Sequence, residues 1–432
     1  MSPVVGGTMA IDLPDYMSTQ NAGRTQAGRT IETEIVDITA ADKGSSRGFF
    51  YRPAGKAPKT AVIMMHPRVN MTRHFLALPI ASSGYAFLGC ASRWENNDAD
   101  ALQEATLLDI AAAVKTLKDR YGIQRVVSVG HSGGGGLFAF YQGQATTTPP
   151  GRLTSAPSGD PPDLNAFEML PLDAMVLLNA HKGEGHFFIE SVDPAVVDES
   201  DPLATLGDVD MYDPCNGYRT PPEPSKYSAE FLARYRAAQR ERNARLDAVA
   251  YGIIAAQRAA QQRLGSAQFS SLDAGEQMRV RRTAYADRYL VIYRTYANPM
   301  FTDLSIDPSD RRVMANAEPA NYVRGSVARI MTPRGFLSTW SGLSSRMMTD
   351  ANIAKSTVPT LLVVGTADEL ICGLEYYRTS FAAAAAKDKQ LVWIKGGDHS
   401  LLPIEPVAGG RDTQAEAANA IIEWLRARFP VS

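Results

Sequence analysis

The sequence predicts an α/β fold in which a mostly parallel sheet is covered by helices on both faces. Short β-branched or apolar runs alternate with longer segments of helical periodicity, as in strand–helix–strand units. One run, residues 125–129, leads directly into Gly130-His131-Ser132-Gly133-Gly134, and a further apolar segment follows at once. A strand, a glycine-rich turn and a helix in this order indicate a nucleophile elbow with Ser132 at its tip.

The strands of this sheet are expected at apolar runs in the first and last parts of the chain. They are expected over residues 33–39, 47–52, 61–65, 85–90, 125–129, 174–180, 360–364 and 391–394. The runs 61–65 and 174–180 are almost continuously apolar, which is typical of strands buried on both faces. Helices are expected over 98–120, which ends before Gly122, and over 412–428, which has one apolar face.

The strand pattern divides the chain into three parts. Residues 1–30 are rich in Gly, Thr and Gln, and they predict a flexible N-terminal arm. Residues 31–180 and 357–432 carry the predicted strands and should form the core. Residues 181–356 lack a comparable strand rhythm and are interpreted as a mainly helical cap, or lid, over the carboxyl edge of the sheet.

The predicted cap contains two helical segments, over residues 228–263 and 274–296. The first has Ser228 as a candidate N-cap and an apolar stripe further along. A dimerisation arm remote from the site is the other interpretation of this insert, and the two interpretations are compatible. A homo-oligomer formed through the cap is therefore one expectation.

The overall composition is that of an ordinary globular protein. The chain is 45% hydrophobic and 21% charged, and its formal net charge is −2, so neither a nucleic acid nor a membrane is expected as a partner. The N-terminus has no basic segment followed by an apolar one, and no window approaches the ~20 apolar residues of a membrane span. The cysteines at 90, 215 and 372 are far apart. We expect a soluble protein in the reducing cytoplasm.

The chemistry predicted for Ser132 requires a general base and a carboxylate that orients it. Asp368 follows the predicted strand 360–364, and His399 follows the predicted strand 391–394. Because the carboxyl ends of parallel strands meet at one sheet edge, both should lie near Ser132, in the chain order Ser…Asp…His. We predict Ser132 as nucleophile, His399 as base and Asp368 as acid. Glu369 is the alternative acid, whereas Asp398 is interpreted as a loop-shaping residue.

Two N–H groups should stabilise the oxyanion that forms when a carbonyl is attacked. Gly133 begins the helix after the elbow, so its N–H is the first donor. The loop after the third predicted strand reads His66-Pro67-Arg68-Val69-Asn70. Pro67 has no N–H, so Arg68 is predicted as the second donor, with Val69 as runner-up. The Arg68 side chain could instead hold a substrate carboxylate, and His66 is expected to orient the loop.

Other polar and apolar residues follow strands at the same predicted edge. The expected substrate-binding residues are Val69, Trp94, His131 and His186. His181, Glu184 and His186 could suggest a metal cluster, but their spacing matches no common zinc signature. Neither a metal nor a cofactor is therefore expected.

Taken together, these motifs resemble those of the α/β-hydrolase superfamily. The resemblance covers residues 30–180 and 357–430, and it rests on His66-Pro67, Gly130-His131-Ser132-Gly133-Gly134, Gly365-Thr366-Ala367-Asp368 and Gly397-Asp398-His399. It implies an eight-stranded, mostly parallel sheet with a cap inserted after the sixth strand. It also implies the roles given above for Ser132, Asp368 and His399. The chain departs from the family pattern where Pro67 replaces the more usual glycine, and its cap is longer than common.

The predicted function is that of a serine hydrolase. The expected substrate is a carboxylic ester or lactone of a hydrophobic small molecule, cleaved through an acyl-enzyme, and aromatic and macrocyclic lactones are among the candidates. A carbon–carbon bond hydrolase would use the same three residues, and a ligand-binding protein on a hydrolase frame would show no turnover. The fold alone does not choose between these reactions.

Overall fold

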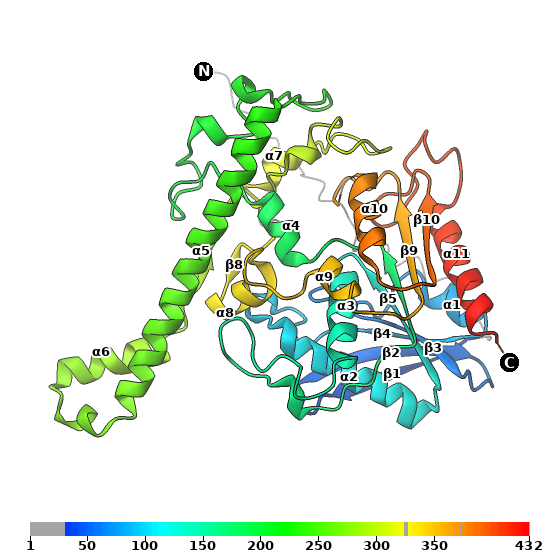
Figure 1. Cartoon of the computed structure of the whole chain (residues 1–432), viewed down its shortest axis with the longest axis horizontal. Coiled ribbons are helices and arrows are strands. Elements are labelled where there is room, and N and C mark those ends of the chain that lie inside the picture. Colours follow the sequence, from blue (N-terminus) through cyan, green and yellow to red (C-terminus); the bar gives the residue numbers. More distant parts are fainter. Residues whose placement is uncertain (1–30, 324–326, 372, 432) are drawn as a thin grey trace, which may run out of the picture.

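The centre of the molecule is an eight-stranded sheet with the strand order β1-β2-β4-β3-β5-β6-β9-β10 (Figure 1). The computed structural model describes residues 31–323, 327–371 and 373–431, so the predicted arm over residues 1–30 lies outside the described residues. The strands are β1 (Ile31–Thr39), β2 (Ser45–Pro53), β3 (Thr60–Met64), β4 (Ala86–Cys90), β5 (Arg125–His131), β6 (Ala174–Leu178), β9 (Thr360–Gly365) and β10 (Lys389–Ile394). β2 pairs antiparallel with β1 and β4, and the remaining pairs are parallel.

All eight predicted strands are present, with ends shifted by one or two residues. Every residue of β3, β4, β6 and β9 is buried, which explains why the sequence shows continuous apolar runs there rather than alternation. The prediction of a mostly parallel, eight-stranded sheet is confirmed.

Helices cover both faces of the sheet, as predicted. They are α1 (Ala77–Ser82), α2 (Gln103–Tyr121), α3 (Gly133–Ala145), α4 (Glu184–Ser191), α5 (Ala229–Leu264), α6 (Ala274–Tyr285), α7 (Ala317–Ala320), α8 (Pro333–Gly335), α9 (Thr349–Ile353), α10 (Leu374–Ala383) and α11 (Thr413–Arg428). Successive residues of β3 point to opposite faces. Ile63 packs in one hydrophobic core with Leu107 of α2 and Leu137 of α3. Val62 packs in the other core, which contains Ile421 of α11.

The helix ends follow the local sequence signals. The helix predicted over 98–120 begins later, at Gln103, because Asp98–Asp100 forms a separate 3₁₀ turn. It ends at Gly122, which has a φ of 65°, a left-handed conformation that favours glycine. α11 begins as predicted, and the side chain of Asp412 caps it by accepting the N–H of Ala415.

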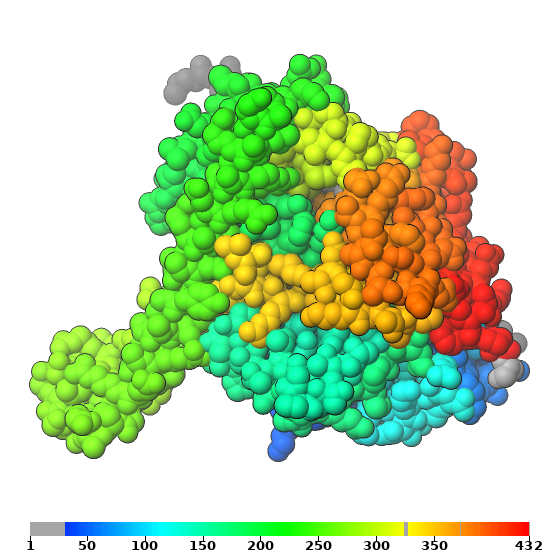
Figure 2. Space-filling view, in the orientation of Figure 1, coloured from blue at the N-terminus to red at the C-terminus, as the bar shows by residue number. Residues whose placement is uncertain are grey.

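The segment between β6 and β9 contributes no strand to the eight-stranded sheet, as far as its residues are described. Its largest element is α5, whose predicted N-cap Ser228 accepts the N–H of Phe231. Figure 1 shows α5 along one side of the molecule, and Figure 2 shows the end carrying α6 as a lobe that projects beyond the body. α4, by contrast, packs against α5 and against the turn Phe336–Trp340.

The helix predicted over 274–296 is wrong beyond Tyr285. Residues Leu290–Val291 form β7, which pairs antiparallel with β8 (Ile330–Met331). The apolar and β-branched residues from Leu290 onward favour a strand once a partner strand is present. Arg294 follows with a φ of 55°, which no regular helix accepts.

Part of this segment is hydrogen-bonded to the core beside α2. Ser338 Oγ donates to Glu104 Oε2 at 2.6 Å and accepts the N–H of Gln103 at 2.8 Å. Thr339 Oγ1 donates to the carbonyl of Ala101 at 2.9 Å. All of these residues are buried, so the bonds fix the segment against the core.

Within the described residues, we find no helix with the length and apolar character needed to cross a membrane.

Candidate active site

Ser132 lies at a sharp turn between β5 and α3. Its φ is 55° and its ψ is −124°, a strained conformation for a residue with a side chain. A Cβ on Gly130 would lie 2.5 Å from the carbonyl oxygen of Gly134, and one on Gly134 would lie 2.7 Å from the carbonyl oxygen of Met65. The glycines on either side of Ser132 are therefore required by close backbone approaches. This is the strand–turn–helix geometry that the sequence predicts for a nucleophile elbow.

The chain has the α/β-hydrolase fold.

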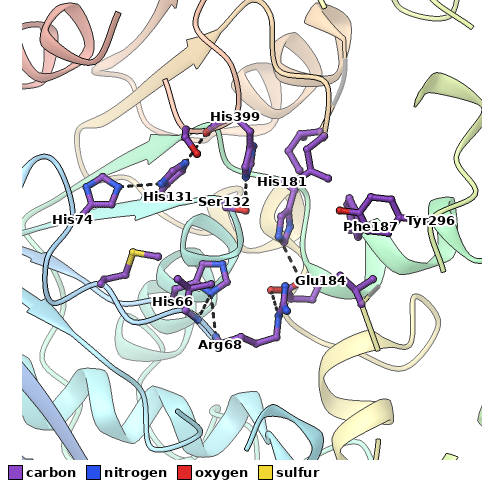
Figure 3. A pocket seen from close by; sticks show the side chains of 16 residues that line it. His66, Arg68, His74, His131, Ser132, His181, Glu184, Phe187, Tyr296 and His399 are labelled. Carbon is purple, nitrogen blue, oxygen red and sulfur yellow. Dashed lines mark hydrogen bonds and ion pairs between the residues drawn. The ribbon is translucent and has the colours of Figure 1, made fainter. Parts of the chain in front are cut away.

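The three residues predicted as nucleophile, base and acid lie in one hydrogen-bonded row, of which Figure 3 shows the contact between Ser132 and His399. Ser132 Oγ is 3.0 Å from His399 Nε2, and His399 Nδ1 is 2.8 Å from Asp368 Oδ2. They come from the loops after β5, β10 and β9, which all leave the carboxyl edge of the sheet. Asp368 is held in turn, because its Oδ1 accepts the N–H groups of Leu370 and Ile371 at 3.0 Å each.

The charges of this row favour a basic imidazole. Burial alone lowers the pKa of His399, but the charge of Asp368 and the hydrogen bond to it outweigh burial, so the pKa is raised above 6.5. Burial raises the pKa of Asp368, but His399, the Ile371 N–H and the Tyr377 hydroxyl together lower it below 3.8. Asp368 is therefore the charged partner of His399.

The two neighbouring acids do not contact the His399 ring through any hydrogen bond between described residues. Burial, followed by the charges of Asp368 and Asp398, raises the pKa of Glu369 to about 7. Asp398 Oδ1 accepts the N–H groups of Ser400 and Leu402 at 2.8 and 2.7 Å, and so shapes the loop. The geometry thus favours Asp368 over Glu369 as the orienting acid.

Two further imidazoles, those of His131 and His74, form a hydrogen-bonded chain that ends at the backbone carbonyl of His399. His131 Nε2 is 2.8 Å from the carbonyl oxygen of His399, so this nitrogen carries the proton and donates. His131 Nδ1 then accepts from His74 Nε2 at 3.0 Å, and His74 Nδ1 accepts the N–H of Leu76 at 3.3 Å. Burial lowers the pKa of His131 to about 4 and that of His74 well below 6.5, so both stay neutral. The sequence offers no signal for the role of His74.

The N–H groups predicted as oxyanion donors are arranged only in part as predicted. Gly133 is the first residue of α3, so its N–H has no acceptor within the helix. The N–H groups of Arg68 and Val69, however, both donate to His66 Nδ1 at 3.0 Å. Both candidate donors are therefore already hydrogen-bonded to the imidazole of His66. His66 orients this loop as expected, but neither N–H points to an oxyanion in this structure.

The Arg68 side chain contacts Glu184 and Trp340. Its Nε is 3.5 Å from Glu184 Oε1, and its guanidinium lies 4.7 Å from the centre of the Trp340 ring. Glu184 is buried, and its other oxygen is 3.7 Å from His181 Nε2. A Cβ on Gly133 would lie 2.5 Å from Glu184 Oε1, so these groups close directly over the elbow.

A pocket that is in part open to solvent lies above Ser132 (Figure 3). Its walls are His66, Arg68, Val69, Met71, His74, His131, Ser132, His181, Glu184, Phe187, Tyr296, Val327, Leu370, Ile371, His399 and Ser400. Val69 and His131 lie in this wall, as expected. Phe187, Tyr296 and Val327 come from the segment between β6 and β9, and of these three Phe187 and Val327 were not predicted as pocket residues.

Trp94 and His186 are absent from this wall, contrary to expectation. Trp94 Nε1 donates to Thr106 Oγ1 at 3.0 Å, which holds the indole against α2. His186 follows Glu184 by two positions on α4, so the two side chains point to different sides of the helix. The His186 ring lies 5.9 Å from that of Tyr376 instead.

Comparison with known proteins gives only remote likenesses. No family model and no curated protein matches the sequence. Among solved structures, the esterase domain of a Rhodothermus marinus protein is 12% identical, covering 92% of this chain and 98% of that chain with a TM-score of 0.42. Est1E from Butyrivibrio proteoclasticus is 12% identical (91% and 98% covered, TM-score 0.43). GrgF, an α/β hydrolase from Penicillium sp. sh18, is 13% identical (92% and 98%, TM-score 0.44).

Proposed function

We propose that the protein is a serine hydrolase that cleaves a carboxylic ester or a lactone of a hydrophobic small molecule through an acyl-enzyme. The observation that carries the proposal is the continuous row from Ser132 Oγ through His399 to Asp368, with Ser132 open to a largely apolar pocket. A serine hydroxyl becomes nucleophilic when an adjacent base can accept its proton, and this row provides the base and the acid that orients it.

Acylation begins when Ser132 Oγ attacks the ester carbonyl and His399 Nε2 takes the hydroxyl proton. Asp368 stabilises the imidazolium that forms, and the N–H of Gly133 donates to the oxyanion. The bond from the carbonyl carbon to the alcohol oxygen then breaks. The leaving alcohol takes the proton from His399, and the acyl group stays on Ser132.

Deacylation repeats these steps with water as the nucleophile. His399 takes a proton from water, the resulting hydroxide attacks the acyl carbon, and the bond to Ser132 Oγ breaks. The serine recovers its proton from His399, and the acid leaves. Every group in these reaction steps is water or a side-chain or backbone group of the described residues, so the proposal includes neither a metal nor a cofactor.

The walls of the pocket favour an apolar substrate. Phe187, Tyr296 and Val327 line the pocket together with Leu370 and Ile371. Apolar walls with a few convergent polar groups are the usual form of a small-molecule site. An ester is preferred to an amide because its leaving group departs more easily, and an aromatic or macrocyclic lactone is within the proposed range.

We further propose that residues 181–356 act as a cap over this site. This segment supplies part of the pocket wall, whereas Ser132, Asp368 and His399 all come from the proposed core, 31–180 and 357–432. The hydrogen bonds of Ser338 and Thr339 to the core hold the part of the cap that carries Trp340. Substrate size should therefore be set by residues of both parts.

Hydrolysis of a graded substrate panel by the wild type and by Ser132→Ala tests the function. The panel holds p-nitrophenyl esters of rising chain length, aryl esters, small and macrocyclic lactones, and an anilide. We expect turnover of esters or lactones by the wild type and its loss in Ser132→Ala, with labelling of Ser132 by a fluorophosphonate. Equal turnover in both proteins would refute the proposal.

The other outcomes separate the alternatives. A wild type that cleaves vinylogous diketones but no ester, and still labels at Ser132, would be a carbon–carbon bond hydrolase. Tight binding of panel members with neither turnover nor labelling would indicate a binding protein on a hydrolase frame.

A further inference from the structure

We propose that His66 is the second oxyanion donor and that it donates from its side-chain Nε2 rather than through the backbone of its loop. This inference rests on the proposed function, because it assigns a role in the attack of Ser132 on a carbonyl. It replaces the predicted backbone donor Arg68, whose N–H is bonded to the same imidazole.

The hydrogen bonds of His66 fix its tautomer. Its Nδ1 accepts two backbone N–H groups, those of Arg68 and Val69, at 3.0 Å each. A nitrogen that accepts these bonds carries no proton, so the proton of the neutral ring is on Nε2. Burial, followed by the charge of Arg68, lowers the pKa of His66 well below 6.5, which keeps the ring neutral at physiological pH.

The position of Nε2 places this proton over the elbow. A Cβ on Gly133 would lie 3.0 Å from His66 Nε2, so the imidazole nitrogen is close to the residue whose N–H is the first donor. His66 lines the same pocket as Ser132 (Figure 3). Among the described residues, none accepts a hydrogen bond from His66 Nε2. A donor that faces a pocket without an acceptor, beside the first oxyanion donor, is suited to receive the oxygen of the substrate.

A neutral imidazole is a suitable electrophile for this position. It can polarise a carbonyl oxygen by hydrogen bonding without carrying a charge of its own. The buried carboxylate of Glu184 lies near the same place, and a charged imidazole would pair with it rather than stay available to the substrate.

His181 provides a comparison within the same pocket. Its Nδ1 also accepts a backbone N–H, that of Gly183 at 3.1 Å, and its Nε2 would lie 3.1 Å from a Cβ on Gly133. Its Nε2, however, is 3.7 Å from Glu184 Oε2, so its proton faces a carboxylate. The two imidazoles have the same tautomer and similar positions, but only His66 has its Nε2–H available to the substrate.

The test uses His66→Asn, in which Oδ1 can take the place of Nδ1 and accept both loop N–H groups. This change keeps the loop and removes the pocket donor. We expect kcat for the best p-nitrophenyl ester to fall by about 10²–10³, with KM nearly unchanged, since the bond forms fully only in the transition state. His66→Gln, whose amide nitrogen can reach the position of Nε2, should recover part of this loss.

The rate ratio of an ester to its thiono analogue separates the loss of an oxyanion donor from a purely structural effect. Sulfur accepts hydrogen bonds weakly, so an oxyanion donor accelerates the ester more than its thiono analogue. The ratio of the ester rate to the thionoester rate should fall in His66→Asn and stay at the wild-type value in His181→Asn. Because the ratio compares two substrates on one protein, it does not depend on the fraction of the variant that folds.

Two results would overturn the proposal. An unchanged ratio in His66→Asn, alongside Ser132-dependent hydrolysis by the wild type, would refute the role of His66 and leave the proposed function standing. A wild type that hydrolyses no panel member would refute both.

Discussion

Replacing Asp368 by Asn should disable the base without disturbing the serine. Asp368 Oδ1 accepts two backbone N–H groups, from Leu370 and Ile371, so an Asn at this position must place its carbonyl oxygen there. Its NH₂ group then takes the place of Oδ2, 2.8 Å from His399 Nδ1. An NH₂ group donates, so His399 Nδ1 must accept, and the ring proton moves to Nε2, which faces Ser132.

The size of the effect follows from this change of tautomer. An imidazole with its proton on Nε2 cannot take the proton of Ser132, and such a swap in a Ser-His-Asp row lowers kcat by about 10⁴. A factor of 10⁴ corresponds to about 5 kcal/mol of transition-state stabilisation, at 1.36 kcal/mol for each factor of ten. We expect a loss of this order in Asp368→Asn, with KM changed little.

The pH dependence should move in a defined direction. The active form of His399 is neutral, so kcat/KM of the wild type rises with pH through the pKa of His399, which Asp368 raises above 6.5. Asp368→Asn removes the largest group that raises this pKa and leaves burial, which lowers it. The acid limb of the residual activity should therefore shift to lower pH.

The assay is steady-state hydrolysis of the best panel ester from pH 5 to 10. Glu369→Gln is the matched control, because it neutralises the adjacent carboxyl, which makes no hydrogen bond to the ring among the described residues. The control should stay within about tenfold of the wild-type kcat. A loss smaller than tenfold in Asp368→Asn, or an equal loss in both variants, would refute the assignment of the acid.

Two further changes probe the elbow and the pocket. Gly133→Ala puts a methyl group 2.5 Å from Glu184 Oε1, so the groups over the elbow must move. We expect kcat to fall by about 10²–10³, and the thermal unfolding midpoint is measured to show that the fold persists. An unaltered kcat would count against the oxyanion site. Phe187→Ala removes part of the apolar wall, so KM for a long-chain or aryl ester should rise about tenfold with kcat unchanged. A rise in KM of the same size for the acetyl ester would contradict the assignment of Phe187 to the pocket.

The core of the fold could be predicted because its signals are local. The runs that form β3 and β6 are buried on both faces and therefore apolar throughout. The glycines around Ser132 are dictated by approaches shorter than a Cβ allows. Asp368 and His399 follow strands of the same parallel sheet, so their meeting with Ser132 follows from topology alone.

The pocket wall could not be predicted in the same way, because its residues depend on long-range packing. His186 and Phe187 are adjacent in the sequence, yet the helical rotation of α4 puts only Phe187 in the wall. Trp94 follows a core strand as expected but turns to Thr106. Tyr296 lines the same pocket although it is far from Phe187 in the sequence, and no periodicity of the sequence predicts that the two lie together.

Whether the predicted donors Arg68 and Val69 have a free N–H depends on hydrogen bonds that the sequence does not reveal. Pro67 has no N–H and cannot be a donor, so the sequence leaves the N–H groups of Arg68 and Val69 as candidates. The ring of His66 engages both. The cytoplasmic location and a homo-oligomer formed through the cap stay predictions.

Direct detection of the acyl-enzyme tests the central claim most sharply. The wild type and Ser132→Ala are mixed with the best panel ester, quenched in acid within the first turnovers, and analysed by intact mass and peptide mapping. We predict a gain in mass equal to the acyl group on the wild type, located at Ser132, and no gain on Ser132→Ala. Turnover without acylation of Ser132, or with acylation at another residue, would contradict the mechanism.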